Sequence, residues 1–293
     1  MNIVLTILAT VVPVFAIMGL GFLYSRFRPL PAQELTNLLF WILIPCLVLG
    51  SLGTQQISPL ELLDIGGGAL IVLAIPALLA LAICFRRPER RAIILASTFM
   101  NSANMAFPLA LFAFGESGLS RQVVFYVAVH VLHVTLGVAL ARGRGGIKEV
   151  FRLPLIYVAA IAVVLAVTGI QIPRAVSEPL NLVGKATIPL MLLLLGGRLS
   201  SAKKKHLPMA SLAAILRLGV GFGAGLLAVW ICDLQGLARA AVLLGSVMPS
   251  AVFNFVLGER YGLFPELLAT SVVLSTLISI GTTPLALWFI GVG

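Results

Sequence analysis

Acidic residues are scarce in this chain, with 10 aspartates and glutamates among 293 residues. All charged residues together make up 10% of the sequence, whereas soluble proteins average about 25%. Hydrophobic residues supply 60%, against about 45–50% in a soluble domain. These proportions exclude a water-soluble enzyme and predict an integral membrane protein, with no stretch left over for a soluble catalytic domain.

Cysteine is also rare, and the three cysteines (Cys46, Cys84 and Cys232) lie far apart in or at the ends of apolar runs. They form neither a CxxC pair nor a metal-ligand spacing, so we interpret them as small buried hydrophobic residues. No acidic residue lies deep in an expected membrane span. The sequence therefore predicts no metal, no cofactor and no enzyme active site, since paired acid and histidine groups at one depth are missing.

Long apolar runs fill most of the chain, and a membrane-spanning helix needs roughly 20 apolar residues. We expect an all-α membrane protein with ten crossings. The first apolar run lacks the basic n-region of a cleavable signal peptide, so we interpret it as a crossing. The expected spans are 2–24, 33–52, 64–85, 92–114, 121–141, 153–172, 179–199, 209–232, 237–258 and 264–290.

Lysine and arginine alternate between the two sides of this expected topology. The loops after odd-numbered crossings hold 15 basic residues, and the opposite side holds only Arg121, Arg174 and Arg239. Because short cytoplasmic loops are enriched in basic residues, this predicts a multi-pass protein of the inner or plasma membrane. Both termini then face the non-cytoplasmic side. The net charge of +10 therefore comes from basic loops on one side of the membrane. We interpret these residues as a topology signal and expect no nucleic-acid partner.

Two of the expected spans carry an interruption at their middle. One reads Met100-Asn101-Ser102-Ala103 with Pro108 following, and the other reads Met248-Pro249-Ser250-Ala251 with Asn254 following. Proline and small polar residues break a helix, and such a break in hydrocarbon is tolerated only where it faces protein or a watery cavity. The sequence therefore predicts that both segments lose their helical form at the membrane midplane.

The interruptions belong to an internal repeat. Pro45 and Pro189 are 144 residues apart, and Met100 and Met248 are 148 apart. Similar offsets predict two related halves of five crossings each, residues 1–148 and 149–293. Because five is odd, the halves must lie in opposite orientations, which is the inverted-repeat architecture of many secondary transporters.

These features, over the whole length, resemble the auxin efflux carrier (AEC) family, whose bacterial members include permeases assigned to malate and malonate. The resemblance implies a ten-helix fold similar to that of bile-acid sodium symporters. Crossings 1, 2, 6 and 7 would form a scaffold that also makes a homodimer. Crossings 3–5 and 8–10 would form a moving core in which the fourth and ninth cross at their breaks. The motifs that carry the resemblance are Ile44-Pro45, Asn101 through Pro108, Phe114-Gly115, Met248-Pro249-Ser250-Ala251, Arg260-Tyr261-Gly262 and Ser275 to Pro284.

The two breaks also suggest a binding site. A half-helix that begins at the midplane presents partial positive charge and free N–H groups, which suit a carboxylate. The alternative is that the polar residues there only satisfy the broken backbone. The residues that we expect to line a site for a small organic anion are Asn101, Ser102, Asn104, Pro108, Pro249, Ser250 and Asn254.

Lys185 and Arg217 are the basic residues placed well inside expected spans, where charge is costly and usually functional. Either would attract an anion, unless it reaches the membrane surface along its flexible stem. His130 and His133 share one helix face and are the titratable candidates for proton coupling, with hydrogen-bonded packing as the alternative.

The sequence thus predicts a secondary transporter that moves a small organic anion by alternating access. Its substrate would be a carboxylate, auxin-like or dicarboxylic. The alternative is a sodium-coupled symporter of the bile-acid type, which sodium-dependent binding would distinguish.

Overall fold

The structure, a computed structural model, describes residues 3–28, 30–53, 55–143, 154–170, 172–200 and 206–291. Within these ranges the protein is helical, and its β-type pairing is a single bridge between two irregular segments. The predicted all-α class is therefore confirmed. The helices are α1 (Ile3–Phe27), α2 (Ala32–Leu38), α3 (Ile44–Leu52), α4 (Pro59–Cys84), α5 (Arg90–Thr98), α6 (Ala106–Leu132), α7 (Val138–Arg142), α9 (Pro154–Thr168), α10 (Arg174–Ser200), α11 (Leu207–Ile215), α12 (Gly221–Ile231), α13 (Gly236–Ser246), α14 (Val252–Tyr261) and α15 (Pro265–Ile290).

Seven helical runs of the described chain are long and apolar enough to cross a membrane, so this is an integral multi-pass protein. They are Ile3–Phe27, Ala32–Leu52, Pro59–Cys84, Ala106–Arg142, Arg174–Ser200, Leu207–Ile231 and Pro265–Ile290. The count falls short of the ten expected crossings for a physical reason. The two interrupted spans are divided into short helices, and α9 has 15 residues.

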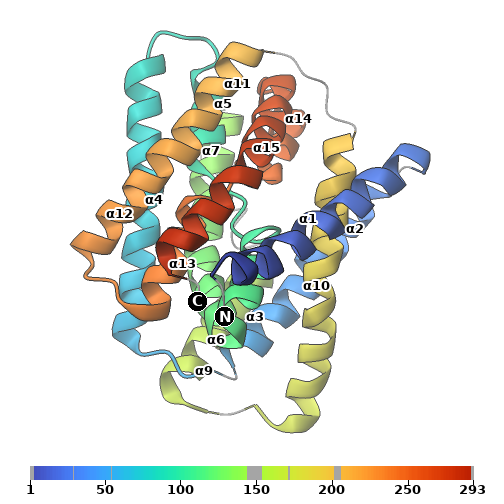
Figure 1. Cartoon of the computed structure of the whole chain (residues 1–293), viewed down its shortest axis with the longest axis vertical. Helices are drawn as coiled ribbons and strands as arrows, with labels where there is room; N and C mark the ends of the chain where they lie inside the picture. The colour runs from blue at the N-terminus through green and yellow to red at the C-terminus, as the bar shows by residue number, and fades with distance from the viewer. Residues whose placement is uncertain are drawn as a thin grey trace.

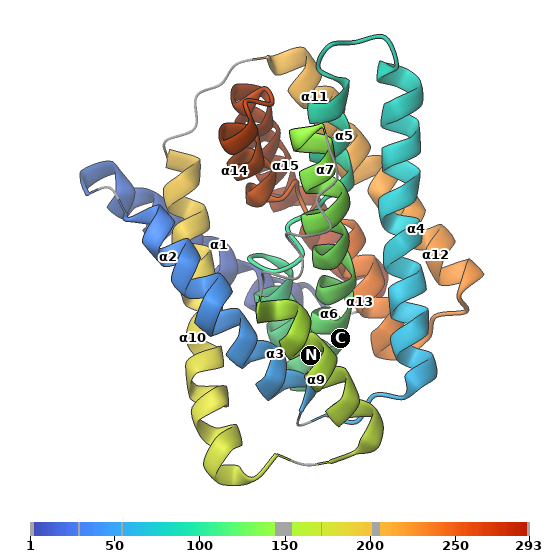
Figure 2. The same ribbon diagram turned by 180° about the vertical axis from the view of Figure 1, so that it is seen from behind.

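The helices form two groups that lie side by side (Figures 1 and 2). In the first group α10 packs against α1 and α3, and α3 packs against α9. The second group holds α4 to α7 and α11 to α15, with α4 against α12 and α6 against α13. The groups meet where α1 contacts α15 and where α3 contacts α6.

Helix α6 bends sharply at Gly115, whose φ of 66° and ψ of −164° lie in a region that is almost exclusive to glycine. The chain continues as helix on both sides of the bend. The sequence had predicted separate spans at 92–114 and 121–141 with a loop between them. The kink falls one residue after the predicted end of the first span, so two helices do meet there, but the second begins directly after Gly115 and no loop separates them.

Three helices contain a π-helical turn, at Leu39–Leu43, His133–Gly137 and Leu216–Val220. A π turn accommodates one extra residue and redirects the side chains around it, and such turns are frequent at functional sites. These three turns carry Phe40, His133 and Arg217, respectively.

Candidate functional site

The two interrupted segments meet at the centre of the molecule. Helix α5 ends at Thr98 and α6 begins at Ala106, while α13 ends at Ser246 and α14 begins at Val252. Between these ends Met100 pairs with Ser250 in an antiparallel bridge. The backbone N–H of Asn101 donates to the carbonyl of Pro249 at 2.7 Å, and that of Ala251 donates to the carbonyl of Phe99 at 3.0 Å. Each break thus satisfies part of the backbone that the other exposes.

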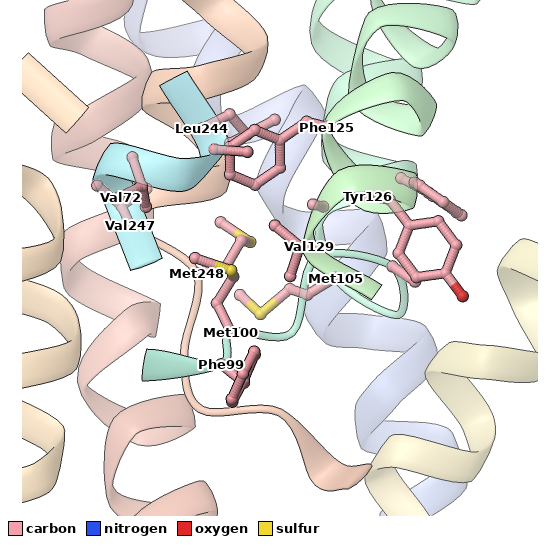
Figure 3. Close-up of a cluster of buried hydrophobic side chains, with 14 of the residues drawn as sticks. Val72, Phe99, Met100, Met105, Phe125, Tyr126, Val129, Leu244, Val247 and Met248 are labelled. Atoms are coloured by element: carbon pink, nitrogen blue, oxygen red, sulfur yellow. The ribbon is translucent and has the colours of Figure 1, made fainter. Parts of the chain in front are cut away.

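Methionine side chains pack around this crossing (Figure 3). Met100, Met105 and Met248 come from the two broken segments, and each is at most 1% exposed. Phe99, which stacks on the ring of His133 with centroids 4.2 Å apart, closes the same cluster. Methionine is unbranched and adapts to irregular space, so it suits a packing layer around backbone that is not helical.

Asn254 secures the crossing from α14. Its Nδ2 donates to the carbonyl of Phe99 at 3.0 Å and to Oγ of Ser250 at 3.0 Å, and its Oδ1 lies 2.7 Å from Nε2 of His133. Oγ of Ser275 accepts from the backbone N–H of Ser250 at 3.0 Å. These contacts link both breaks to α14, α15 and the π turn after α6, so they hold the crossing together.

A cavity of about 70 Å³ lies beside the crossing. At about 10–15 Å³ for each water position, it holds several water molecules or a small solute. Asn101, Ser102 and Asn104 of the first break contribute to its wall. Aromatic rings form much of the rest of the cavity wall. Among them, His130 stacks on Phe40 with ring centroids 5.6 Å apart. The other lining residues that the argument uses are Thr36, Tyr126, His133, Arg198, Val252 and Phe253.

Three residues of the cavity wall each carry a buried polar atom without a hydrogen-bond partner in the part of the chain that the structure describes: Nδ2 of Asn101, Oη of Tyr126 and Nε2 of His130. The residues are 4%, 3% and 7% exposed, so bulk solvent does not reach them freely. Buried polar groups are almost always paired, and leaving one unpaired costs about 1–3 kcal/mol. Three residues around one cavity therefore have hydrogen-bonding capacity that the described part of the chain does not use.

Arg198, in the last turn of α10, is the charged residue among those that line this cavity. Its Nη2 donates to Oγ1 of Thr36 at 2.8 Å. Arg198 also lines an adjoining cavity of about 290 Å³, together with Glu259 and Glu266. Sequence reasoning counted this arginine only as a topology signal. Because Arg198 lies at the end of a span, the sequence did not indicate that it lines a cavity. Nothing in the sequence distinguished the aromatic lining residues Tyr126, Phe40 and Phe253 from other apolar residues of the spans.

The structure divides the predicted site residues into separate sets. Asn101, Ser102, Asn104, His130 and His133 line the cavity, whereas the remaining candidates do not. Pro249, Ser250 and Asn254 belong to the crossing, and Pro108 is buried in the first turn of α6.

The two predicted basic candidates also lie apart from the cavity wall. Lys185 is exposed on the surface of α10. Arg217 is fully buried and donates to three backbone carbonyls. Among the described residues, no group of three or more His, Cys, Asp or Glu side chains is arranged to hold a metal ion.

Comparison with known proteins gives one consistent result. A protein of Methanocaldococcus jannaschii named as an uncharacterized transporter is 30% identical over 208 residues, which cover 67% of this chain and 66% of that relative. An uncharacterized transporter of Methanothermobacter thermautotrophicus is 24% identical over 94% of this chain and 96% of its own length. A Rhizobium meliloti protein named "Putative malonate transporter" is 24% identical over 97% of this chain and 95% of its own length.

The family described as membrane transport protein matches nearly the whole chain, over residues 6–150 and 146–287. This match covers both broken segments and both helix groups, and it agrees with the sequence-based resemblance to the auxin efflux carriers. The chain therefore belongs to the membrane transport protein family, the AEC family of carriers.

Proposed function

We propose that this protein is a secondary carrier that binds a small organic anion at the crossing of its two broken helices and moves it by alternating access. The observation that carries the proposal is the set of unpartnered polar atoms on Asn101, Tyr126 and His130 around one cavity. An amide and a phenol both donate hydrogen bonds to a carboxylate. A bound anion would therefore satisfy groups that the protein leaves open.

The helix ends beside the cavity favour negative charge. Helices α6 and α14 both begin at the breaks, and neither N-terminus has a side-chain cap. A helix N-terminus carries about half a positive elementary charge and several N–H groups without helical partners. Residues on both breaks, Asn101 and Val252 among them, line the cavity, so an anion there would lie near both ends.

Arg198 supplies a full positive charge to the same cavity. We propose that it interacts with the carboxylate and that the aromatic wall contacts the remainder of the solute. The name of the Rhizobium meliloti relative mentions malonate, which makes malonate the natural first probe.

The proposed transport cycle rests on the two helix groups. We propose that the chain forms ten crossings in two inverted five-helix halves, with α5–α6 and α13–α14 as the two broken spans. The grouping of α1, α3, α9 and α10 apart from the other helices supports a scaffold and a moving core. The cavity that adjoins the site through Arg198 supports a conformation open on the side that the basic loops identify as cytoplasmic.

The test is uptake and binding of a carboxylate panel by purified protein. We expect the wild-type protein in proteoliposomes to accumulate radiolabelled malonate or another mono- or dicarboxylate of the panel. Asn101→Ala removes one donor to a charged group, which is worth about 1.5–3 kcal/mol, so Kd should rise roughly 10- to 150-fold.

The matched control is Asn37→Ala, because Asn37 is exposed on α2, where its Oδ1 accepts a hydrogen bond from Nε2 of Gln33 at 3.4 Å. That variant should bind and transport like the wild type. Equal affinity of Asn101→Ala and the wild type would contradict a site at this cavity. Sodium-dependent uptake would favour a symporter of the bile-acid type instead.

A further inference from the structure

Arg217 lies on the opposite side of the crossing from the expected anion chemistry, at the C-terminal ends of two half-helices. Its Nη1 donates to the carbonyls of Ser97 at 3.0 Å and Thr98 at 2.8 Å, the last two residues of α5. Its Nη2 donates to the carbonyl of Ser246 at 2.9 Å, the last residue of α13. One guanidinium therefore joins the ends of both broken spans.

The charge of the Arg217 guanidinium nearly equals the opposite partial charge of the two helix C-termini that it contacts. Each helix C-terminus carries about half a negative elementary charge and carbonyls without helical partners. Two such ends amount to about one negative charge, which a single guanidinium neutralises. Arg217 is 0% exposed, and no carboxylate of the described residues forms an ion pair with it. The helix ends are thus its counter-charge.

Local structure is built to place this side chain. Arg217 lies in the π-helical turn that precedes α12. A Cβ on Gly221 would clash with Nη2 of Arg217 and lie 2.8 Å from the carbonyl oxygen of Ser246. A Cβ on Gly225 would clash with Oγ of Ser246. Gly219 and Gly223 on the same helix have open space instead. The close approach of α12 to α13 therefore depends on two particular glycines.

In carriers built from broken helices, carbonyls at half-helix C-terminal ends coordinate the coupling cation. We propose that Arg217 is a fixed internal cation that occupies those carbonyls permanently, so that this protein needs no sodium ion to assemble its site. Among the described residues, the first turns of α6 and α14 at the same crossing hold no acidic side chain, so these positive ends are left for the exchangeable anion. This inference deepens the proposed carrier function and rests on it only for the identity of that anion.

The experiment measures thermal unfolding of purified, substrate-free protein in sodium, potassium or N-methylglucamine chloride at one ionic strength. We expect the wild-type Tm to agree within about 1 °C in the three salts, and Arg217→Ala to melt roughly 5 °C or more below it in N-methylglucamine. Sodium should restore part of that loss in a concentration-dependent way, because a ligand that binds only the folded state stabilises it. Arg217→Lys keeps the charge and should show an intermediate Tm without a sodium response.

Further variants keep the test decisive if Arg217→Ala fails to fold. Arg217→Gln retains hydrogen-bond donors without the charge. Gly221→Ala places a methyl group against the guanidinium and displaces it. Gly223→Ala is its matched control, because a Cβ there meets open space. Loss of folding in Arg217→Gln but not in Arg217→Lys would support the need for charge. A sodium-specific rise in the wild-type Tm, or an Arg217→Ala variant that matches the wild type in every salt, would overturn the inference. Because no substrate is present, failure of the carrier proposal would appear separately, as absence of carboxylate binding with these cation results unchanged.

Discussion

At the scale of single residues, the polar side chains of the membrane interior have two different tasks. Asn254 donates hydrogen bonds to the side chain of Ser250 and to the backbone carbonyl of Phe99. The backbone N–H of Ser250 donates to the hydroxyl of Ser275. Asn101, in contrast, has its Nδ2 unpartnered in the cavity wall. The first task stabilises irregular backbone that lipid would not tolerate, and the second, in our proposal, is to bind the solute.

Arg198 provides the first prediction at this scale. Arg198→Gln removes the charge that lines the cavity, so the Kd for a carboxylate should rise roughly 10- to 100-fold, as expected for loss of a charge-assisted hydrogen bond. Calorimetric titration with malonate would measure it. Arg174→Gln is the control, because Arg174 is exposed at the other end of the same helix. An unchanged Kd in Arg198→Gln would remove this arginine from the site.

The two histidines provide the second prediction. His133 is hydrogen-bonded to Asn254 and stacked on Phe99, whereas His130 lines the cavity and its buried Nε2 has no hydrogen-bond partner among the described residues. We expect His130 to contact the anion, so that His130→Phe weakens binding while wild-type uptake changes less than about twofold between pH 6 and 8. Uptake that rises with an imposed proton gradient in the wild type, but not in His130→Phe, would instead show proton coupling.

At the scale of helices, the sequence predicted both breaks and the end of the fourth span at residue 114, but it expected a loop where the structure has a single bend. Proline and small polar residues at mid-span in two related segments predict loss of helix, and the structure interrupts the helices between Thr98 and Ala106 and between Ser246 and Val252. The expected loop is replaced by a bend at Gly115, because glycine reaches this backbone conformation at a single residue. Only its backbone angles reveal what it does.

Gly115 provides the prediction for this scale. Alanine at this position would be forced into a backbone region that costs roughly 1–3 kcal/mol, so Gly115→Ala should lower the free energy of unfolding by that amount. Thermal or denaturant unfolding in detergent would measure the change. Gly66→Ala is the control, because Gly66 is helical in α4 with open space around it. If the two variants had equal stability, the bend would not need glycine.

At the scale of the whole molecule, composition was sufficient to predict an integral membrane protein, whereas the internal repeat suggested by the matching offsets stays a prediction. The residues that face the cavity were less predictable, because a helical pattern does not reveal which polar side chain pairs inside the protein. Arg217 illustrates this difficulty. Its position inside a span was foreseen, but its burial and its carbonyl partners on two distant helices depend on a crossing that only the structure shows.

Topology can be tested on the intact cell. After replacement of the native cysteines, a cysteine at Arg87, exposed after α4, should be shielded from an impermeant maleimide. A cysteine at Gln235, exposed before α13, should be labelled from outside. This pattern follows from the concentration of basic residues in the loops that we assign to the cytoplasm. The reverse pattern would invert the orientation and with it the side to which we propose that the larger cavity opens.

The central claim is that the two broken segments meet, and cysteine cross-linking tests it most directly. Met100 and Ser250 form a non-hydrogen-bonded antiparallel pair, in which Cα atoms lie about 4.5 Å apart, within the range of a disulfide. In a background without native cysteines, Met100→Cys with Ser250→Cys should form an intramolecular disulfide in the membrane under mild oxidation. The control pair is Ser51→Cys with Ser120→Cys, whose native hydroxyl oxygens lie 3.1 Å apart. A disulfide in both pairs is the predicted result. Cross-linking of the control pair without cross-linking at the crossing would contradict the claim.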